Sequence, residues 1–73
     1  MLKKRSLSLA GHATSLALEP EFWTVLEAMA AAEGLSLPEL IVRIDGERGR
    51  SLLASACRVR ALAWAGRRQD SLI

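Results

Sequence analysis

The residues best suited to chemistry in this sequence are cations near its beginning. Lys3, Lys4 and Arg5 stand next to one another. Adjacent positive charges can neutralise the phosphates of a polyanion, and such binding depends strongly on salt. A tail that only improves solubility is the alternative interpretation. His12, beside Gly11, is a second candidate for a phosphate contact, although a single loop histidine is more often only exposed or packed locally.

Catalytic and metal-binding chemistry find little support in the residue types. The chain has one cysteine, Cys57, and one histidine, so no structural zinc site can form within it. The spacing of its Ser, His and Asp residues does not suggest a nucleophile with a base, and no Gly-rich phosphate loop is present. We therefore expect a protein that is not an enzyme, with no catalytic residues, no metal and no cofactor.

The length of the chain predicts one small domain. At 73 residues, a single core needs help from disulfides, metals or oligomerisation. One cysteine cannot form an intrachain disulfide, so oligomerisation remains. No apolar run approaches the roughly 18 residues that span a bilayer, and no continuous apolar segment follows the basic start as in a signal peptide. We expect a cytoplasmic protein without membrane contact.

Charge is segregated along the sequence. Seven of the eight acidic residues lie between residues 19 and 47, and only one arginine, Arg43, lies among them. From Arg48 onward the chain turns basic again. This pattern predicts one acidic and two basic regions, of which only the basic ones could meet a polyanion.

Two segments before residue 19 show the alternation of a β-strand. They are residues 5–9, RSLSL, and residues 13–18, ATSLAL, with Gly11 suited to a turn between them. The sequence leaves open whether residues 5–9 add a strand or lie along a partner as an arm. In the second segment one face carries Thr14, Leu16 and Leu18, and the other carries Ala13, Ser15 and Ala17.

Helices are predicted over the rest of the chain. The first begins at Pro20, a residue tolerated in the first turn, and ends before Gly34, a typical residue just after a helix. Ser36-Leu37-Pro38-Glu39 is a capping box, S-x-x-E, and opens a second helix that ends near residue 45. A third helix is expected over residues 52–65, where Gly66 would break it.

These elements divide the chain into three parts. Residues 1–12 form a basic N-terminal arm with a possible extra strand, and residues 13–46 form the core. Residues 47–73 form a linker, the third helix and a frayed tail. Trp23 and Trp64 are interpreted as packing residues, and Arg60 is expected to stack on Trp64 or to pair with an acidic residue across a dimer.

The strand at residues 13–18 has no obvious partner in its own chain. A strand of about five residues cannot stand alone in water. The simplest solution is a second copy of the same strand from a second molecule, with Trp23 covering the subunit boundary. The expected dimer core consists of Thr14, Leu16, Leu18, Phe22, Leu26, Leu40 and Ile41.

Four features together resemble those of a known family: the strand, the helix opened by Glu19-Pro20, the turn at Gly34 and the capped second helix. Residues 14–44, TSLALEPEFWTVLEAMAAAEGLSLPELIVRI, resemble the ribbon-helix-helix proteins, the dimeric β-ribbon DNA binders of the Arc and Met repressor type. The block GHATSLALEPEFW and the later LLASACRVRAL look like a bacterial subgroup with an added strand region and a third helix. The fold class implied is mainly α with a short β-ribbon.

This resemblance implies a homodimer in which two copies of the strand pair antiparallel and enter the major groove of double-stranded DNA. Its base-reading positions fall on Ala13, Ser15 and Ala17. Family readers are typically long polar side chains, because bidentate hydrogen bonds distinguish base pairs, and this chain departs from that pattern. The amides of Ser36 and Leu37 would meet a phosphate at the start of the second helix.

Two functions follow from the sequence and the resemblance. The first is a sequence-specific transcriptional regulator, a repressor, whose affinity comes partly from Lys3, Lys4 and Arg5, and which could bind DNA as a dimer of dimers. The second is an interaction module, antitoxin-like or an adaptor, that has lost base readout. Such a module would hold a protein partner through its third helix.

Overall fold

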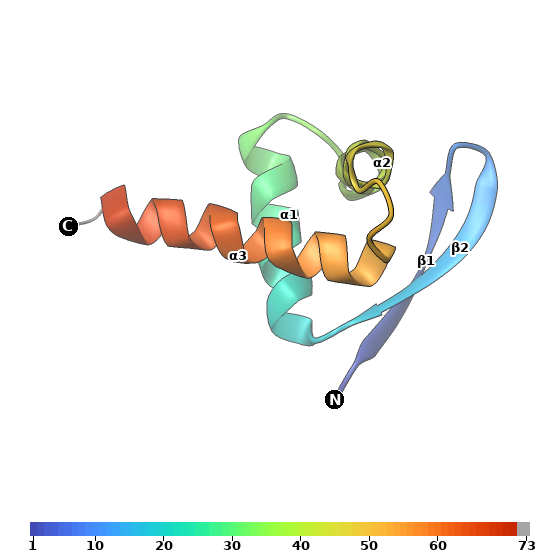
Figure 1. Cartoon of the computed structure of the whole chain (residues 1–73), viewed down its shortest axis with the longest axis horizontal. Helices are drawn as coiled ribbons and strands as arrows, with labels where there is room; N and C mark the ends of the chain where they lie inside the picture. Colours follow the sequence, from blue (N-terminus) through green and yellow to red (C-terminus); the bar gives the residue numbers. More distant parts are fainter. Residues whose placement is uncertain (72–73) are drawn as a thin grey trace.

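The computed structural model describes the backbone of residues 1–71 and the side chains of residues 1–68. Within that range the chain forms a two-stranded antiparallel hairpin followed by three helices (Figure 1). The strands are β1 (Lys3–Leu9) and β2 (His12–Leu18), and the helices are α1 (Pro20–Ala32), α2 (Leu37–Glu47) and α3 (Leu53–Ser71). The predicted class, mainly α with a short β-ribbon and an additional C-terminal helix, is confirmed.

β1 and β2 pair along their full lengths, with Leu9 opposite His12 beside the turn. Ala10 (φ 52°) and Gly11 (φ 84°) form a two-residue turn in which both φ angles are positive, as the right-handed twist of a hairpin favours. Gly11 adopts this conformation readily, whereas for Ala10 it costs about 1 kcal/mol. The expectation that β2 lacks a partner in its own chain was wrong, because the alternating residues before the turn form a strand and not an arm.

The turn between α1 and α2 depends on Gly34. Its φ of 69° turns the chain out of the helix. The amide of Gly34 donates to the carbonyl of Ala31 (3.2 Å), and the amide of Leu35 donates to that of Ala30 (2.9 Å). These two bonds form the Schellman arrangement, which satisfies the last carbonyls of a helix. The chain therefore leaves α1 in a defined direction and places Ser36 at the start of α2.

α3 is longer than its sequence predicts. It continues through Gly66 to Ser71, so the expected break at Gly66 was wrong. A glycine inside a helix costs about 1 kcal/mol relative to alanine, which is insufficient to end this one. Arg68 lies 4.8 Å from the centroid of the Trp64 ring and contacts it across the glycine. The tail expected to be frayed is helical as far as Ser71, and its last two residues lie outside the described range.

A single hydrophobic core lies between the hairpin and the helices. It needs no second chain to bury its largest members, and no buried side-chain N or O atom of the described residues lacks a hydrogen bond. Of the described helices, none has the length and apolar character needed to cross a membrane. The core residues are Leu9, Leu16, Leu18, Trp23, Leu26, Met29, Ala30, Leu40, Ile41, Ile44, Cys57 and Ala61.

Trp23 lies inside this core beneath β1. Only 4% of its surface is exposed, and its indole N–H donates to the backbone carbonyl of Lys3 (2.8 Å). A buried indole requires such a partner for its polar end. Trp23 therefore packs beneath β1 of its own chain, whereas the sequence placed it at a subunit boundary.

Removing a core leucine should destabilise the chain far more than removing an exposed one. Leu18 is fully buried, and Leu62 on α3 is 69% exposed. We expect Leu18→Ala to lower the free energy of unfolding by roughly 2–5 kcal/mol, and Leu62→Ala by less than about 0.5 kcal/mol. Urea denaturation followed by circular dichroism measures both. Equal losses would show that the leucine of β2 does not belong to the core.

Candidate nucleic-acid interface

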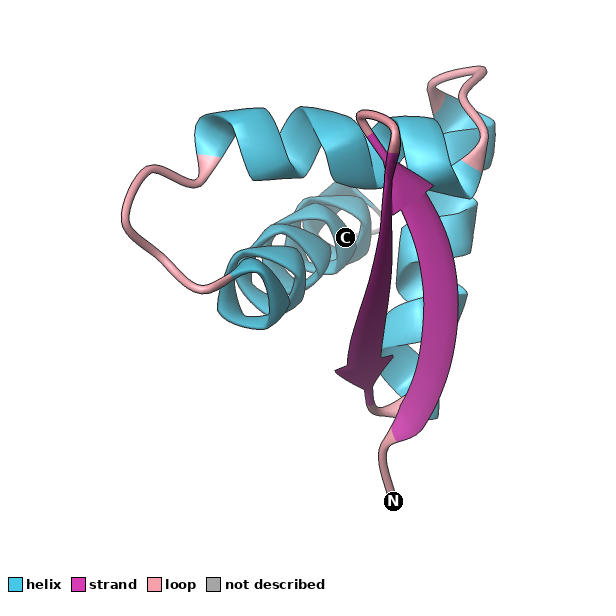
Figure 2. Cartoon of the chain, turned by 90° about the vertical axis from the view of Figure 1, so that its right-hand side faces the viewer, coloured by secondary structure: helices cyan, strands magenta, loops and turns pink. Residues whose placement is uncertain are grey.

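One face of the hairpin points away from the helices. Residues directly opposite in an antiparallel pair project to the same side. The register therefore places Ser6 beside Ser15, Ser8 beside Ala13 and Lys4 beside Ala17 on that side. We call these six side chains the outer face. Figure 2 looks onto the strands with the helices behind them.

The outer face is exposed and free of carboxylates. Five of its six side chains are exposed, and Ala17 is half-buried. Its side chains are a lysine, three serines and two alanines, so nothing on it repels an anion. Leu16 and Leu18 alternate with them along β2 and are buried in the core. The alternation of β2 thus buries one set of side chains in the core and exposes the other set to solvent.

The predicted base-reading residues Ala13, Ser15 and Ala17 lie together on this surface. Sequence reasoning did not assign Ser6 and Ser8 to it, and it treated Lys4 as part of an arm. The signal was present, because the strict alternation of RSLSL already places both serines on one side of a strand. Knowing that the two strands pair within one chain brings the two sets of residues together.

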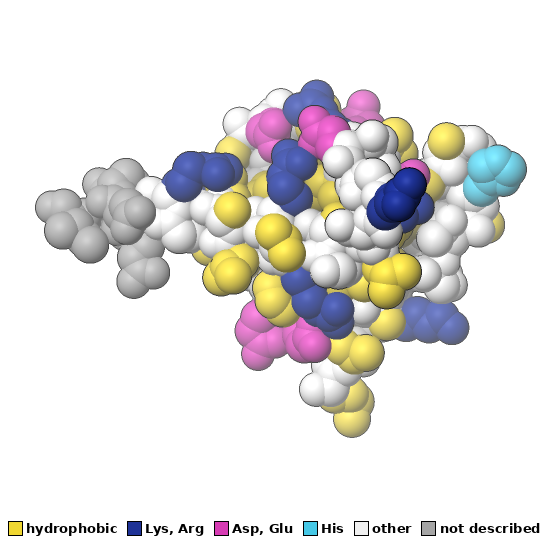
Figure 3. Space-filling model, viewed as in Figure 1, with side chains coloured by type: hydrophobic (Ala, Val, Ile, Leu, Met, Phe, Trp, Pro, Cys, Tyr) yellow, Lys and Arg dark blue, Asp and Glu magenta, His cyan; other side chains and the backbone are white. Residues whose placement is uncertain are grey.

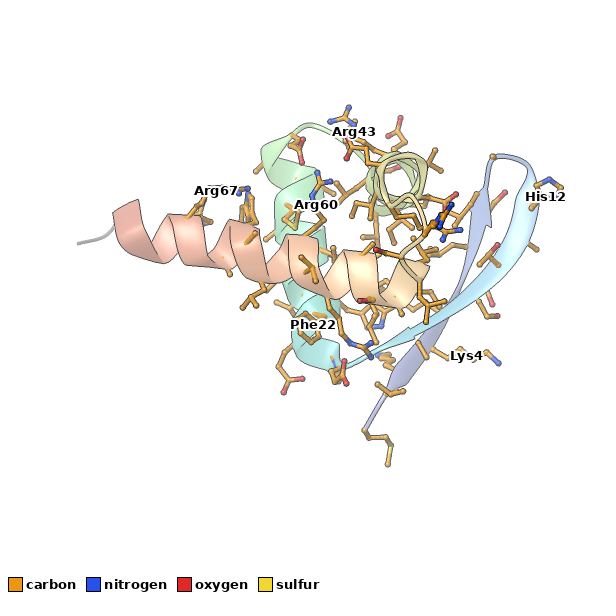
Figure 4. All side chains as sticks on the ribbon, in the orientation of Figure 1. Lys4, His12, Phe22, Arg43, Arg60 and Arg67 are labelled. Atoms are coloured by element: carbon orange, nitrogen blue, oxygen red, sulfur yellow. The ribbon has the colours of Figure 1, made fainter. Side chains whose placement is uncertain are left out.

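The predicted basic arm is divided between the two faces of β1. Arg5 points to the inner face, where its guanidinium lies 2.9 Å from a carboxylate oxygen of Glu27 and 5.0 Å from the centroid of the Trp23 ring. These contacts hold Arg5 against α1 and away from the outer face. Lys3 and Lys4 remain exposed, and Figure 4 shows Lys4 projecting from β1 away from the helices.

Most other arginines pair with carboxylates of the same chain. Three pairs, those of Arg5, Arg58 and Arg60, join the basic ends of the sequence to carboxylates of its acidic middle, so these regions are in contact in the fold. Arg60 binds Glu47 of its own chain (2.6 Å), and the arginine over the Trp64 ring is Arg68, so the structure shows neither of the two contacts expected for Arg60. The further pairs are Arg43–Glu33 (3.0 Å), Arg48–Asp45 (2.6 Å) and Arg58–Glu19 (2.9 Å).

A few cations keep their charge available. Among the side chains of residues 1–68, Lys3, Lys4, Arg50 and Arg67 have no carboxylate within ion-pair distance. Of these, only Lys4 belongs to the outer face. His12 lies next to the turn and projects from the end of the hairpin (Figure 4), where it could approach a polyanion bound along the strands.

The start of α2 is closed by its own capping box. The Ser36 amide donates to the Glu39 carboxylate (2.8 Å), and the Glu39 amide donates to the Ser36 hydroxyl (3.2 Å). These hydrogen bonds lower the pKa of Glu39. A phosphate at this helix start would meet the amide of Leu37, since Pro38 has none, and it would have to displace the carboxylate from Ser36.

Nothing in the described part of the chain suggests catalysis. No group of three or more His, Cys, Asp or Glu side chains there could hold a metal ion. Burial raises the pKa of the Cys57 thiol to about 11, so it stays protonated and unreactive at neutral pH. The outer face, which is exposed and carries no carboxylate, is the best candidate for a functional surface.

Comparison with known families agrees with this architecture. A family model described as "Ribbon-helix-helix domain" matches residues 2–65. The chain belongs to the ribbon-helix-helix family. Members of this family are often DNA-binding regulators or antitoxins. Among curated proteins, none matches the sequence.

The ribbon-helix-helix chain is also similar to a solved structure, that of an uncharacterized protein from Bordetella pertussis Tohama I. The two are 36% identical with a TM-score of 0.83, and the similarity covers 100% of this chain and 62% of the other. The chain thus spans somewhat less than two thirds of that protein. The likeness supports the hairpin and α3 as parts of one fold.

The capping box makes the stability of this ribbon-helix-helix chain depend on acid pH. Because the pKa of folded Glu39 lies below its ordinary value of 4.5, its contribution is complete above that value and is lost as the pH falls through the folded pKa. Gln keeps the hydrogen-bond acceptor without the charge. We expect the unfolding free energy of Glu39→Gln to fall less steeply than that of the wild type between about pH 5 and pH 3, as measured by urea denaturation at each pH. If the unfolding free energies of the two proteins fall equally with pH, the Glu39 carboxylate does not contribute to the cap.

Proposed function

We propose that the protein is a sequence-specific DNA-binding transcriptional regulator, a repressor, that acts in the cytoplasm as a homodimer through its outer face. The observation that carries the proposal is this exposed sheet face without a carboxylate, presented by a chain of the ribbon-helix-helix family. Double-stranded DNA is the partner that such a face suits, because its charge is a dense row of phosphates.

The proposed dimer uses the second edge of β2. Within the described residues the sheet has two strands, and β2 is paired on the side of β1 only. An unpaired strand edge is a ready template for pairing with another chain. Antiparallel pairing of two β2 strands would give the two-fold symmetry that operator half-sites mirror. In that dimer Thr14 and Phe22, half-buried in one chain, are available for contacts across the interface.

Base recognition by this face would be modest. Ser15 offers one hydroxyl, which can donate to or accept from a base edge. Ala13 and Ala17 offer only apolar contact, such as to a thymine methyl. Phosphate contacts by Lys3, Lys4, His12 and the Leu37 amide would then supply much of the affinity. The proposed regulator therefore combines weak base readout with salt-dependent attraction.

The alternative is a protein-interaction module on the same fold. Leu52, Val59 and Leu62 are 76%, 61% and 69% exposed, and Figure 3 shows hydrophobic side chains along the surface of α3. Beside them, α2 and α3 enclose a hollow of about 210 Å³ with Ile44 and Arg48 in its lining. These features, with the two alanines on the outer face, favour a partner held through α3.

A carboxylate placed on the outer face should weaken DNA binding. We expect labelled fragments of mixed genomic DNA to bind the wild type more tightly than about 10 µM at low salt, as fluorescence anisotropy measures. Ser15→Asp should lower that affinity about tenfold or more, because like charges then face each other. Ser55→Asp is the control, since Ser55 is an exposed serine on α3. Absence of wild-type binding would contradict the DNA-binding proposal and favour the interaction module.

The homodimer has its own test. Sedimentation equilibrium at micromolar concentration should give twice the chain mass of 7.9 kDa. A folded monomer at that concentration would exclude pairing through β2 as the resting state of the protein, because an unpaired β2 edge would then persist in solution.

A further inference from the structure

β1 would widen the ribbon of the proposed dimer from two strands to four. In the proposed dimer, two β2 strands pair at the centre and each chain adds its own β1 outside, so the sheet has the order β1-β2-β2-β1. Its four strands span three spacings of about 4.8 Å, or roughly 14 Å between the outer strand axes. This inference therefore rests on the proposed function.

Such a sheet is too wide to enter DNA as a two-stranded ribbon does. The major groove of B-DNA is about 12 Å wide and admits an α-helix or two strands. A sheet of four strands must therefore span the groove. Its central β2 strands would lie over base edges, and its outer β1 strands would lie over the sugar-phosphate backbones that border the groove.

The side chains of β1 suit that position. Lys4 is exposed on the outer face and has no carboxylate partner among the described residues. Ser6 and Ser8 are exposed on the same face, and their hydroxyls can donate to phosphate oxygens. Short side chains also permit the strand backbone to approach the DNA closely. The charge, position and hydrogen-bonding capacity of these side chains all suit contact with phosphates.

We propose that β1 is the backbone-contacting part of the DNA interface, with Lys4, Ser6 and Ser8 of each chain bound to phosphates along the two borders of the major groove. Lys3, its neighbour, lies opposite Leu18 on the other face of the hairpin and contributes less. β1 thus adds affinity that does not depend on base sequence.

Paired lysine variants test this assignment. Anisotropy titrations over a series of salt concentrations give the slope of log K against log salt, which changes by about 0.9 for each phosphate contact. Lys4→Ala should reduce the magnitude of the slope by about 1.8 for the two chains of a dimer, and weaken binding by a similar factor on duplexes of different sequence. Lys3→Ala should change it less. Arg67→Ala removes the same charge from α3, far from the hairpin (Figure 4), and should leave the slope unchanged.

Serine variants provide an independent measurement. Ser6→Asp and Ser8→Asp should each lower affinity about tenfold or more, through repulsion from phosphate. Circular dichroism and thermal unfolding verify that both variants fold. Should either fail to fold, Lys4→Ala still decides the matter, since Lys4 is exposed and its removal leaves the core intact.

The outcomes separate the two proposals. If the wild type does not bind DNA at low salt, the proposed function fails and this inference fails with it. If the wild type binds but Lys4→Ala and the serine variants bind equally well, DNA binding stands and the role of β1 is overturned. Equal losses for Lys3→Ala and Lys4→Ala would also overturn it, because they would indicate a flexible basic arm instead of a strand face.

Discussion

The pairing of β1 with β2 within one chain is the constraint on which the rest of this structure depends. A strand alone in water leaves its amides and carbonyls without structural partners, and a hairpin alone is marginal. Here the hairpin is stable because its inner face delivers Leu9, Leu16 and Leu18 to the core. Trp23 ties β1 to α1 through the carbonyl of Lys3. The pairing of the two strands is therefore stable only because both strands also pack against the helices.

Ion pairs decide which charges remain available for a partner. Arg5, Arg58 and Arg60 each reach a carboxylate that is distant in the sequence, namely those of Glu27, Glu19 and Glu47. These partly exposed pairs contribute little to stability. They also neutralise cations that would otherwise attract a polyanion. Basic residues that appear interchangeable in the sequence thus acquire different roles from the face on which the fold places them.

The sequence predicted features that depend on local geometry. The capping box at Ser36, the start of α1 at Pro20 and the turn at Gly34 were found because caps and turns require particular residues at fixed spacing. The alternation around Leu16 correctly identified a strand and its buried face.

Features that depend on distant partners could not be read in this way. The pairing of Arg5 with Glu27 joins residues that no local rule connects. Gly66 does not end α3 because its cost is small compared with that of ending a helix whose Trp64 packs against the core. The expectation of an unpaired β2 failed because the strand alternation of residues 5–9 was recognised but their pairing with residues 13–18 across the turn at Gly11 was left open.

The added strand β1 also contributes to a core that lies within one chain. In a chain with one strand, association with a second copy is needed both to complete the fold and to form the DNA-binding ribbon. Here the core residues Leu18, Leu26, Leu40 and Ile41 are fully buried within one chain. In the proposed dimer, association would therefore mainly set the width and symmetry of the outer face. We propose that such a wide face of short side chains would follow the outline of a duplex more than it would read individual bases, in keeping with its alanines and serines.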